Sequence, residues 1–356
     1  MISYTDAIAE AHRAGLEDNL KSYIIGLGVN YPNGADGTTK GLAEKYPNRV
    51  LDCPVSEKAV TGMCVGMASM GYNPIVHHGR VEFALLAMDE ILTQAAKWNY
   101  MFGGDYPCHF SARFNIGRQW GNGPQHTSSY NSLFANTPGL NVLWPSRPNE
   151  AYIFTRAMHS SVSPSLHMEH RWLFKTQDTL LENIPHGDIP TASVYGDCSD
   201  VVILTYGDGL VEALKVRDSV TDMNVSVICL TAFIDDRSLD KKILNLIKSS
   251  KSLFILDTSN YEYGLLQSVV GNLAQQESLP SELEIFAPPF IPVATAAKLV
   301  KQYYPICPTI VKFLRDKGRT KIEADEYSFD EINLPPAYDF TNNAPDLMIW
   351  KSLFND

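Results

Sequence analysis

Short apolar runs alternate with amphipathic segments through the first hundred residues. Residues 4–17 have the period of an amphipathic helix, and the apolar run 23–25 reads as a strand before a Gly-, Asn- and Pro-rich loop over 26–37. The segment RVLDCPVSEKAVTGMCVGMASMG then predicts a short strand, a turn and a helix rich in small residues. A strand over 74–77 and a helical run over 82–100 follow, so strands and helices alternate from the start of the chain.

The middle of the chain continues this alternation after one long interruption. PCHFSA begins a strand, but the segment 113–129 holds several glycines and little periodicity, which predicts a long loop of the kind that often carries function. The strand NVLWP, a helix over 148–160 and the strand PSLHME come next. The polar stretch 175–200, with two prolines, is typical of a connection between domains.

The second half repeats the pattern with stronger apolar runs. VVILTY, VSVICL, SLFILD and ELEIFA are separated by predicted helices over 208–220, 239–249 and 263–275. Continuous β-branched strands with helical crossovers indicate a mostly parallel sheet. We therefore predict an α/β protein of two domains with mostly parallel sheets, over residues 1–185 and 195–305. A C-terminal extension over 306–356 is acidic and is expected to contact a neighbouring subunit.

Charge and composition narrow the class of protein. The formal net charge is −11 and no basic run occurs, which argues against nucleic-acid binding, because that requires clustered Lys and Arg. The first twenty residues carry acids and lack a cationic start, and no apolar stretch approaches membrane-spanning length. We expect a cytoplasmic protein. Six cysteines form no C-x-x-C pair, so free thiols are expected.

Three residues could carry chemistry. Glu57 stands where a strand leads into a helix, behind a possible N-cap at Ser56, and taken alone it is an ordinary first-turn acid. Phe83 begins the next helix, where a Phe is usually part of the core. His126 lies in the Gly-rich loop, where an imidazole can act as an acid, a base or a hydrogen-bond donor to an oxyanion.

The order of these motifs resembles a known family. PVSE, a Gly/Ala helix, MDEI followed by AAKWNYMFGG, and PQHTSS followed by LFANTPGLNVLWPSRPNEA closely resemble the beta subunit of the thiamine-diphosphate-dependent decarboxylase component of 2-oxoacid dehydrogenases. DVVILTYGDGLVEAL, VSVICLTAF and SLFILDTS look like the C-terminal domain that this subunit shares with transketolases. The resemblance covers about residues 2–305. It implies a pyrimidine-binding domain followed by a transketolase C-terminal-like domain.

The resemblance also implies roles for the three residues. Glu57 would hydrogen-bond the aminopyrimidine ring of thiamine diphosphate and promote its imino tautomer, and Phe83 would stack on the face of that ring. His126 would lie near the thiazolium and donate to the substrate carbonyl oxygen. Glu57 and His126 are thus predicted as catalytic residues, and Glu57 and Phe83 as cofactor-binding residues.

The diphosphate and its metal are not expected on this chain. Thiamine enzymes hold Mg²⁺ with a Gly-Asp-Gly motif followed some distance later by Asn. Here Gly207-Asp208-Gly209 follows the first strand of the second domain, and no Asn-Asn pair occurs before 342–343, so Asp208 is predicted to be an N-cap or turn residue. A partner alpha subunit would hold the Mg²⁺ and diphosphate in an α2β2 assembly. No metal site is predicted at His77-His78 or at His167 and His170.

The chain departs from the family where a substrate would bind. The family has an acidic residue and then apolar or amide residues where this chain reads His77-His78-Gly79-Arg80. Several polar and aromatic side chains in or near the loop before His126 could meet a polyhydroxylated or anionic substrate. The predicted substrate-facing residues are His78, Arg80, Arg113, Arg118, Trp120 and Gln125.

Three functions follow from these observations. In the first, a 2-oxoacid is decarboxylated and its acyl fragment passes to a lipoyl acyltransferase, as in a dehydrogenase complex. In the second, a transketolase-like carboligase transfers a two-carbon unit to an aldehyde, ketone or sugar. In the third, the chain is a non-catalytic structural partner of an alpha subunit. The closeness of the resemblance favours the first, and Glu57 together with His126 argues against the third.

Overall fold

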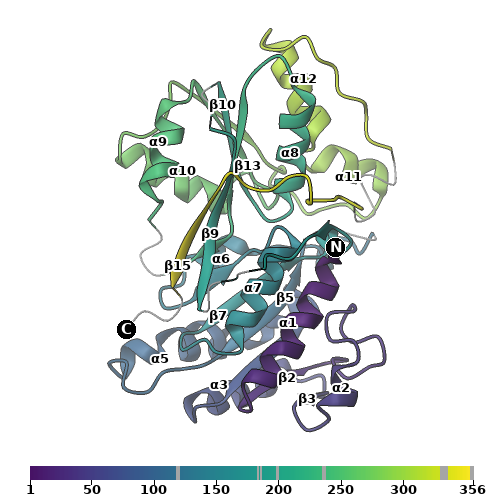
Figure 1. Ribbon diagram of the computed structural model, residues 1–356, viewed down its shortest axis with the longest axis vertical. Helices are drawn as coiled ribbons and strands as arrows, with labels where there is room; N and C mark the ends of the chain where they lie inside the picture. The colour runs from purple at the N-terminus through teal and green to yellow at the C-terminus, as the bar shows by residue number, and fades with distance from the viewer. Residues whose placement is uncertain are drawn as a thin grey trace.

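The protein has two lobes, each built on a β-sheet. A computed structural model describes residues 1–117, 121–182, 184, 187–197, 200–234, 238–328 and 336–352. Figure 1 shows the N-terminal half as the lower lobe, and most of the remaining chain as the upper lobe. The structure confirms the predicted α/β class with sheets that are mainly parallel.

The lower sheet has seven strands, of which the edge strand β12 comes from the second half of the chain. In spatial order the strands are β12 (Ala232–Phe233), β6 (Asn141–Leu143), β7 (Ser165–His170), β5 (Ser111–Ile116), β4 (Asn73–His78), β2 (Ser22–Gly26) and β3 (Val50–Leu51). Only β12 runs antiparallel to its neighbour. The second half of the chain thus closes one edge of the first sheet.

The upper sheet has six strands. In spatial order they are β14 (Glu282–Phe286), β13 (Ser252–Leu256), β10 (Val201–Tyr206), β11 (Val225–Leu230), β9 (Asp188–Tyr195) and β15 (Leu347–Ser352). The first four are parallel, and β9 and β15 are antiparallel additions. A separate two-stranded pair joins β1 (Ile2–Ser3) to β8 (Gln177–Asp178).

Helices connect the strands in both lobes. The lower lobe contains α1 (Tyr4–Asp18), α2 (Leu42–Lys45), α3 (Glu57–Ser69), α4 (Val81–Ala84), α5 (Ala96–Met101), α6 (Asn131–Ala135) and α7 (Pro148–Met158). The upper lobe contains α8 (Gly209–Ser219), α9 (Lys241–Ser249), α10 (Leu265–Gln275), α11 (Ala297–Tyr303) and α12 (Cys307–Asp316). Between α4 and α5 lie a 3₁₀ turn, η1 (Leu85–Ala87), and a π-helical segment, η2 (Asp89–Ala95). Short 3₁₀ turns also form at η3 (Pro124–His126) and η4 (Arg171–Leu173).

Local sequence explains how α1 begins and how closely it packs. The Ser3 side chain caps α1 by accepting from the Asp6 backbone N–H at 3.1 Å. Gly15 faces His159 just beyond α7, and a Cβ at position 15 would come within 2.2 Å of that imidazole ring. A glycine there therefore allows α1 and α7 to lie side by side, as Figure 1 shows.

The polar stretch 175–200 is more than a connection. It contains β9, an inner strand of the upper sheet, although Pro190 lies within it. Proline lacks a backbone donor, and Pro190 pairs with Trp350 at the point where the register of β15 shifts. The irregular pairing accommodates Pro190. The prolines of this stretch are the reason that its sequence predicts a linker.

One further expectation differs from the structure. The loop predicted over 113–129 starts later, because β5 extends to Ile116 with every residue buried. The polar residues Arg113 and Asn115 are buried in this strand, which is why the sequence did not predict it. The described part of the C-terminal extension includes α12 and pairs with its own chain as β15, and its contact with a neighbouring subunit stays a prediction.

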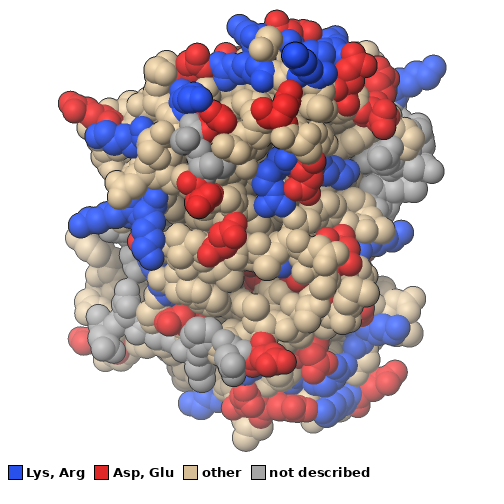
Figure 2. Space-filling model, turned by 45° about the horizontal axis from the view of Figure 1, so that its top comes forward, with Lys and Arg blue, Asp and Glu red and all other residues tan. Residues whose placement is uncertain are grey.

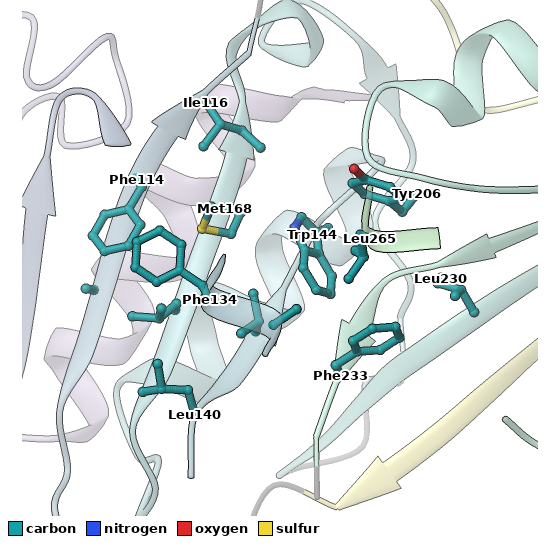
Figure 3. Close-up of a cluster of buried hydrophobic side chains, with 14 of the residues drawn as sticks. Phe114, Ile116, Phe134, Leu140, Trp144, Met168, Tyr206, Leu230, Phe233 and Leu265 are labelled. Atoms are coloured by element: carbon teal, nitrogen blue, oxygen red, sulfur yellow. The ribbon is translucent and has the colours of Figure 1, made fainter. Parts of the chain in front are cut away.

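One apolar cluster links the two lobes. Figure 3 shows Phe114, Ile116, Phe134 and Met168 from the lower lobe on one side, and Tyr206, Leu230 and Leu265 from the upper lobe on the other. Trp144 lies between them, and its indole N–H donates to Asn131 at 3.0 Å. Since the lobes share this core, the loops at their junction are held by both sheets.

The surface carries both signs of charge. On the face in Figure 2, Lys and Arg alternate with Asp and Glu, and a broad area between them is uncharged. Among the residues described, no helix is long and apolar enough to span a bilayer. Five cysteines, at 53, 64, 108, 229 and 307, are free thiols as expected, and Cys198 lies outside the described residues.

Candidate active site

A small cleft brings Glu57 and Phe83 together. It lies where β2 and β4 end, and its volume is about 90 Å³. In parallel α/β sheets, ligands bind beyond the carboxyl ends of the strands. The lining residues are Leu27, Cys53, Pro54, Val55, Glu57, Val60, Val76, His77, His78, Gly79 and Phe83. The fold thus places the predicted cofactor residues at the expected edge of the sheet.

Glu57 is the first residue of α3 and is half-buried. Ser56 occupies the N-cap position as predicted, but its side chain makes no capping hydrogen bond. The positive end of the helix dipole favours a carboxylate in this first turn. The helix start therefore positions an acid at the cleft, opposite an aromatic ring.

His126 approaches the same aromatic ring from the loop. The ring centroids of Phe83 and His126 are 5.7 Å apart, with an angle of 52° between the planes. Phe83 is 40% exposed, so part of its face remains open to a ligand. The His126 Nδ1 atom is buried and has no hydrogen-bond partner within the described part of the chain. A buried polar atom without a partner is costly, so this nitrogen is available to a ligand or a water molecule.

Two residues beside Phe83 hold the His126 loop. The Arg80 guanidinium donates to the His126 carbonyl oxygen at 2.7 Å, and Glu82 accepts from the Ser128 backbone N–H at 2.7 Å. Burial lowers the pKa of Arg80, although Glu82 and Asp36 oppose that shift. Arg80 thus contacts the loop backbone, and its contact with a substrate stays a prediction. No feature of the sequence predicted the contact that Glu82 makes.

The two adjacent histidines are neutral groups in this environment. His78 Nε2 lies 3.1 Å from Thr61 Oγ1, and burial lowers the pKa of His78 to about 4. Burial also lowers the pKa of His77 to about 3, and the nearby positive charge of Arg113 contributes. At neutral pH both side chains are therefore uncharged hydrogen-bonding groups at the cleft rather than cations.

Arg113 does not lie in the loop before His126. It is on β5, fully buried, and its guanidinium donates to both carboxylate oxygens of Glu169 at 2.5 and 2.8 Å. A third contact joins Arg113 Nη1 to His12 Nε2 at 2.8 Å. The prediction that Arg113 faces a substrate is not supported, because all of these contacts lie inside the lobe.

Of the remaining predicted substrate residues, Gln125 is exposed on the 3₁₀ turn η3, whose last residue is His126. Arg118 and Trp120 lie outside the described residues. Their contacts with a substrate stay predictions.

Asp208 is a structural residue in this fold. It occupies the N-cap position of α8, but its side chain makes no capping bond and instead accepts from Thr258 Oγ1 at 2.5 Å. His170 Nε2 lies 3.4 Å from the same carboxylate. In the described portion of the chain, no group of three or more His, Cys, Asp or Glu side chains could hold a metal ion.

Comparison with known proteins agrees with this geometry. Residues 1–176 match the family model "Transketolase, pyrimidine binding domain". The subunit beta of 2-oxoisovalerate dehydrogenase from Bacillus subtilis is 27% identical, covering 88% of this chain and 97% of the relative. The chain is a relative of the beta subunits of the thiamine-diphosphate-dependent 2-oxoacid dehydrogenases.

Other relatives widen the range of substrates within this family. The beta subunit of acetoin:2,6-dichlorophenolindophenol oxidoreductase from Cupriavidus necator is 29% identical over 76% of this chain and 81% of its own. The pyruvate dehydrogenase E1 component subunit beta of Saccharomyces cerevisiae is 27% identical over 87% of each chain. A solved structure titled "Split gene transketolase, inactive beta4 tetramer" superposes with a TM-score of 0.70 at 14% identity, covering 88% of this chain and 97% of that one. That likeness concerns the fold.

Proposed function

We propose that this chain is the beta subunit of an enzyme that decarboxylates a 2-oxoacid and transfers the acyl fragment, and that it is active only with an alpha subunit. The proposal rests on a cleft lined by Glu57 and Phe83, and on the contact between the Phe83 ring and the His126 ring. The unpaired Nδ1 of His126 and the open face of Phe83 fit a bound aminopyrimidine and thiazolium pair. The alpha subunit would supply the Mg²⁺ and diphosphate site of an α2β2 assembly, in the cytoplasm.

Each residue of the site has a distinct task. When bound, thiamine diphosphate would supply a nucleophilic carbon and an electron sink for the decarboxylation. The Glu57 carboxyl holds a ring nitrogen of the pyrimidine by a hydrogen bond, and Phe83 fixes the ring plane. The His126 imidazole donates a hydrogen bond to the substrate oxygen where negative charge develops. Arg80 and Glu82 hold the His126 loop against the cleft.

A substitution at Glu57 tests this proposal. Glu57→Gln keeps the shape of the side chain but removes its acidic proton, so turnover of pyruvate with a dye acceptor by the αβ complex should fall by about 100-fold or more. Glu10→Gln, on the solvent-exposed side of α1, is the matched control and should leave turnover unchanged. Unchanged activity in Glu57→Gln would overturn the proposal and would support a non-catalytic structural role for the chain.

A second candidate is a carboligase that passes the two-carbon unit to an aldehyde, ketone or sugar. An uncharged pocket on the other side of the His126 loop favours it, because it offers a place for a neutral acceptor. Supplying pyruvate with sugar aldehydes and analysing for a new carbon–carbon bond distinguishes this reaction from transfer to a lipoyl acyltransferase. A reductively acylated lipoyl domain as the sole product would exclude the second candidate.

A further inference from the structure

A second pocket lies beside the His126 loop and is distinct from the Glu57 cleft. It has a volume of about 380 Å³, which is enough for a small organic molecule. One wall is the loop itself, and the others belong to the upper lobe. The lining residues are Pro124, Thr127, Ser128, Ser129, Tyr130, Thr258, Ser259, Asn260, Phe290, Ile291, Pro292, Val293, Tyr303 and Tyr304. No residue is shared with the lining of the Glu57 cleft.

Among the described residues that line the pocket, none has a charged side chain, although the protein carries a net charge of −11. A phosphate or carboxylate ligand requires Arg or Lys for tight recognition, and an ammonium ligand requires a carboxylate. The polar groups that line this pocket are instead hydroxyls and one side-chain amide, from Asn260. The composition of the walls thus selects for a neutral ligand.

Two of the lining hydroxyls already donate their protons to carboxylates within the protein. Thr258 Oγ1 donates to Asp208 at 2.5 Å, and Ser259 Oγ donates to Asp257 at 2.6 Å. A hydroxyl has one proton and two lone pairs, so these oxygens can offer a ligand only acceptor capacity. A matching ligand must therefore bring hydrogen-bond donors of its own, as a polyol does and a simple ketone or carboxylate does not.

Two more hydroxyls at the other walls follow the same rule. Thr127 Oγ1 donates to the Gly123 carbonyl oxygen at 2.7 Å, and the Tyr303 hydroxyl donates to the Ile291 carbonyl oxygen at 3.0 Å. Four lining hydroxyls, drawn from both lobes, thus offer acceptor oxygens to a ligand that brings its own donors.

The rim of the pocket is apolar and open to solvent. Phe290 and Ile291 are 62% and 60% exposed, and Tyr130 is 40% exposed on a backbone with φ of 47°. A non-glycine residue in this left-handed region is uncommon and occurs preferentially at functional sites. Exposed rings beside hydroxyl acceptors suit a molecule with one apolar face and several hydroxyl groups.

The pocket is physically joined to the residue that we place at the reaction centre. Pro124 and Thr127 flank His126, and a Cβ at Gly123 would come within 2.7 Å of Thr295 Oγ1 in the upper lobe. The segment that carries Phe290 therefore packs against the start of the His126 loop. A ligand in the pocket would touch both and would stabilise the position of the loop.

We propose that this pocket binds a neutral, hydroxyl-rich small molecule of the size of a monosaccharide. Binding does not depend on the proposed acyl transfer, so the two are tested separately. Binding is measured on the full-length chain by saturation-transfer NMR with D-xylose, D-glucose and methyl glucoside. The charged counterparts are glucose 6-phosphate and glucuronate. Turnover of pyruvate with a dye acceptor by the αβ complex, measured without sugar, reports on the Glu57 cleft.

The expected result is saturable, millimolar binding of at least one neutral sugar, with its phosphorylated or carboxylated counterpart at least about 10-fold weaker. Phe290→Ala should weaken binding by about 10-fold, and Tyr303→Phe should weaken it by several-fold through loss of one acceptor oxygen. Tyr100→Ala is the matched control, because Tyr100 is 92% exposed and does not line the pocket.

Three outcomes would overturn the inference. The first is that none of the neutral sugars gives a saturable signal at concentrations up to about 0.1 M. The second is that the charged counterparts bind equally well, and the third is that Phe290→Ala leaves the affinity unchanged. Since Phe290 lies at the surface, its replacement is expected to leave the melting temperature close to that of the unmodified chain. Absence of sugar binding together with normal pyruvate turnover would overturn the pocket inference alone. Sugar binding without pyruvate turnover would overturn the proposed function alone.

Discussion

The buried pair of Arg113 and Glu169 gives a prediction that separates a structural role from a substrate-binding one. Both side chains are fully buried, and two hydrogen bonds join them. Burial alone would raise the pKa of Glu169, but Arg113 and His167 outweigh it and hold that pKa well below its usual range. Glu169 is therefore an anion inside the lobe at all ordinary pH values. Glu169→Gln would leave the guanidinium of Arg113 as a buried charge without a counter-ion.

Removing one partner of a buried ion pair costs about 3–5 kcal/mol, because the other charge remains desolvated. This is a large part of the total stability of about 5–15 kcal/mol that is typical of a folded domain. The free energy of unfolding should be measured by urea denaturation, followed by circular dichroism and extrapolated linearly to water. We expect Glu169→Gln to unfold at a much lower urea concentration than the unmodified chain.

The matched control is a similar ion pair at the surface. Arg156 and Asp18 are 2.6 Å apart, but their side chains are 27% and 68% exposed, so Asp18→Asn should cost less than about 1 kcal/mol. If Glu169→Gln were no more destabilising than Asp18→Asn, the assignment of Arg113 to the interior would be refuted. An accompanying rise in KM for the 2-oxoacid would then restore Arg113 as a substrate residue.

Three further predictions follow from the site and the fold. Phe83→Ala should raise the thiamine diphosphate concentration needed for half-maximal activity by about 10-fold or more, while Phe102→Ala, which alters an equally exposed ring, should not. Burial lowers the pKa of His77, His78 and His159 to about 3, 4 and 3. The unfolded chain then binds more protons below pH ~6.5, so each histidine should reduce stability by about 1.4 kcal/mol per pH unit as pH falls from there towards 4. A urea midpoint that is equal at pH 7.5 and 5.5 would contradict this. Deletion of residues 346–356 removes β15 and exposes the edge of β9, so the shortened chain should melt at a lower temperature and aggregate, as light scattering would detect.

The sequence alone determined the alternation of strands and helices. Apolar runs such as VVILTY predict strands on their own, because a strand that is buried on both faces is apolar along most of its length. Glu57, Phe83 and His126 were predicted as site residues because the motifs around them resemble a known family, and in the fold Glu57 and Phe83 line one cleft. Local pattern was sufficient for the strands, and motif order was sufficient for this prediction.

Only the tertiary structure decided which polar residues are buried and where each contact leads. Arg113 looks like a loop donor in the sequence, and it becomes a core residue because Glu169, on the neighbouring strand β7, neutralises it. Pro190 looks like a linker residue, and it fits a sheet because a strand from the far end of the chain shifts register beside it. The contact of Arg80 with the His126 loop likewise joins residues 46 positions apart. Such partners are distant in sequence, and pairing between charges or backbone groups depends on distance in space, which a local pattern does not record.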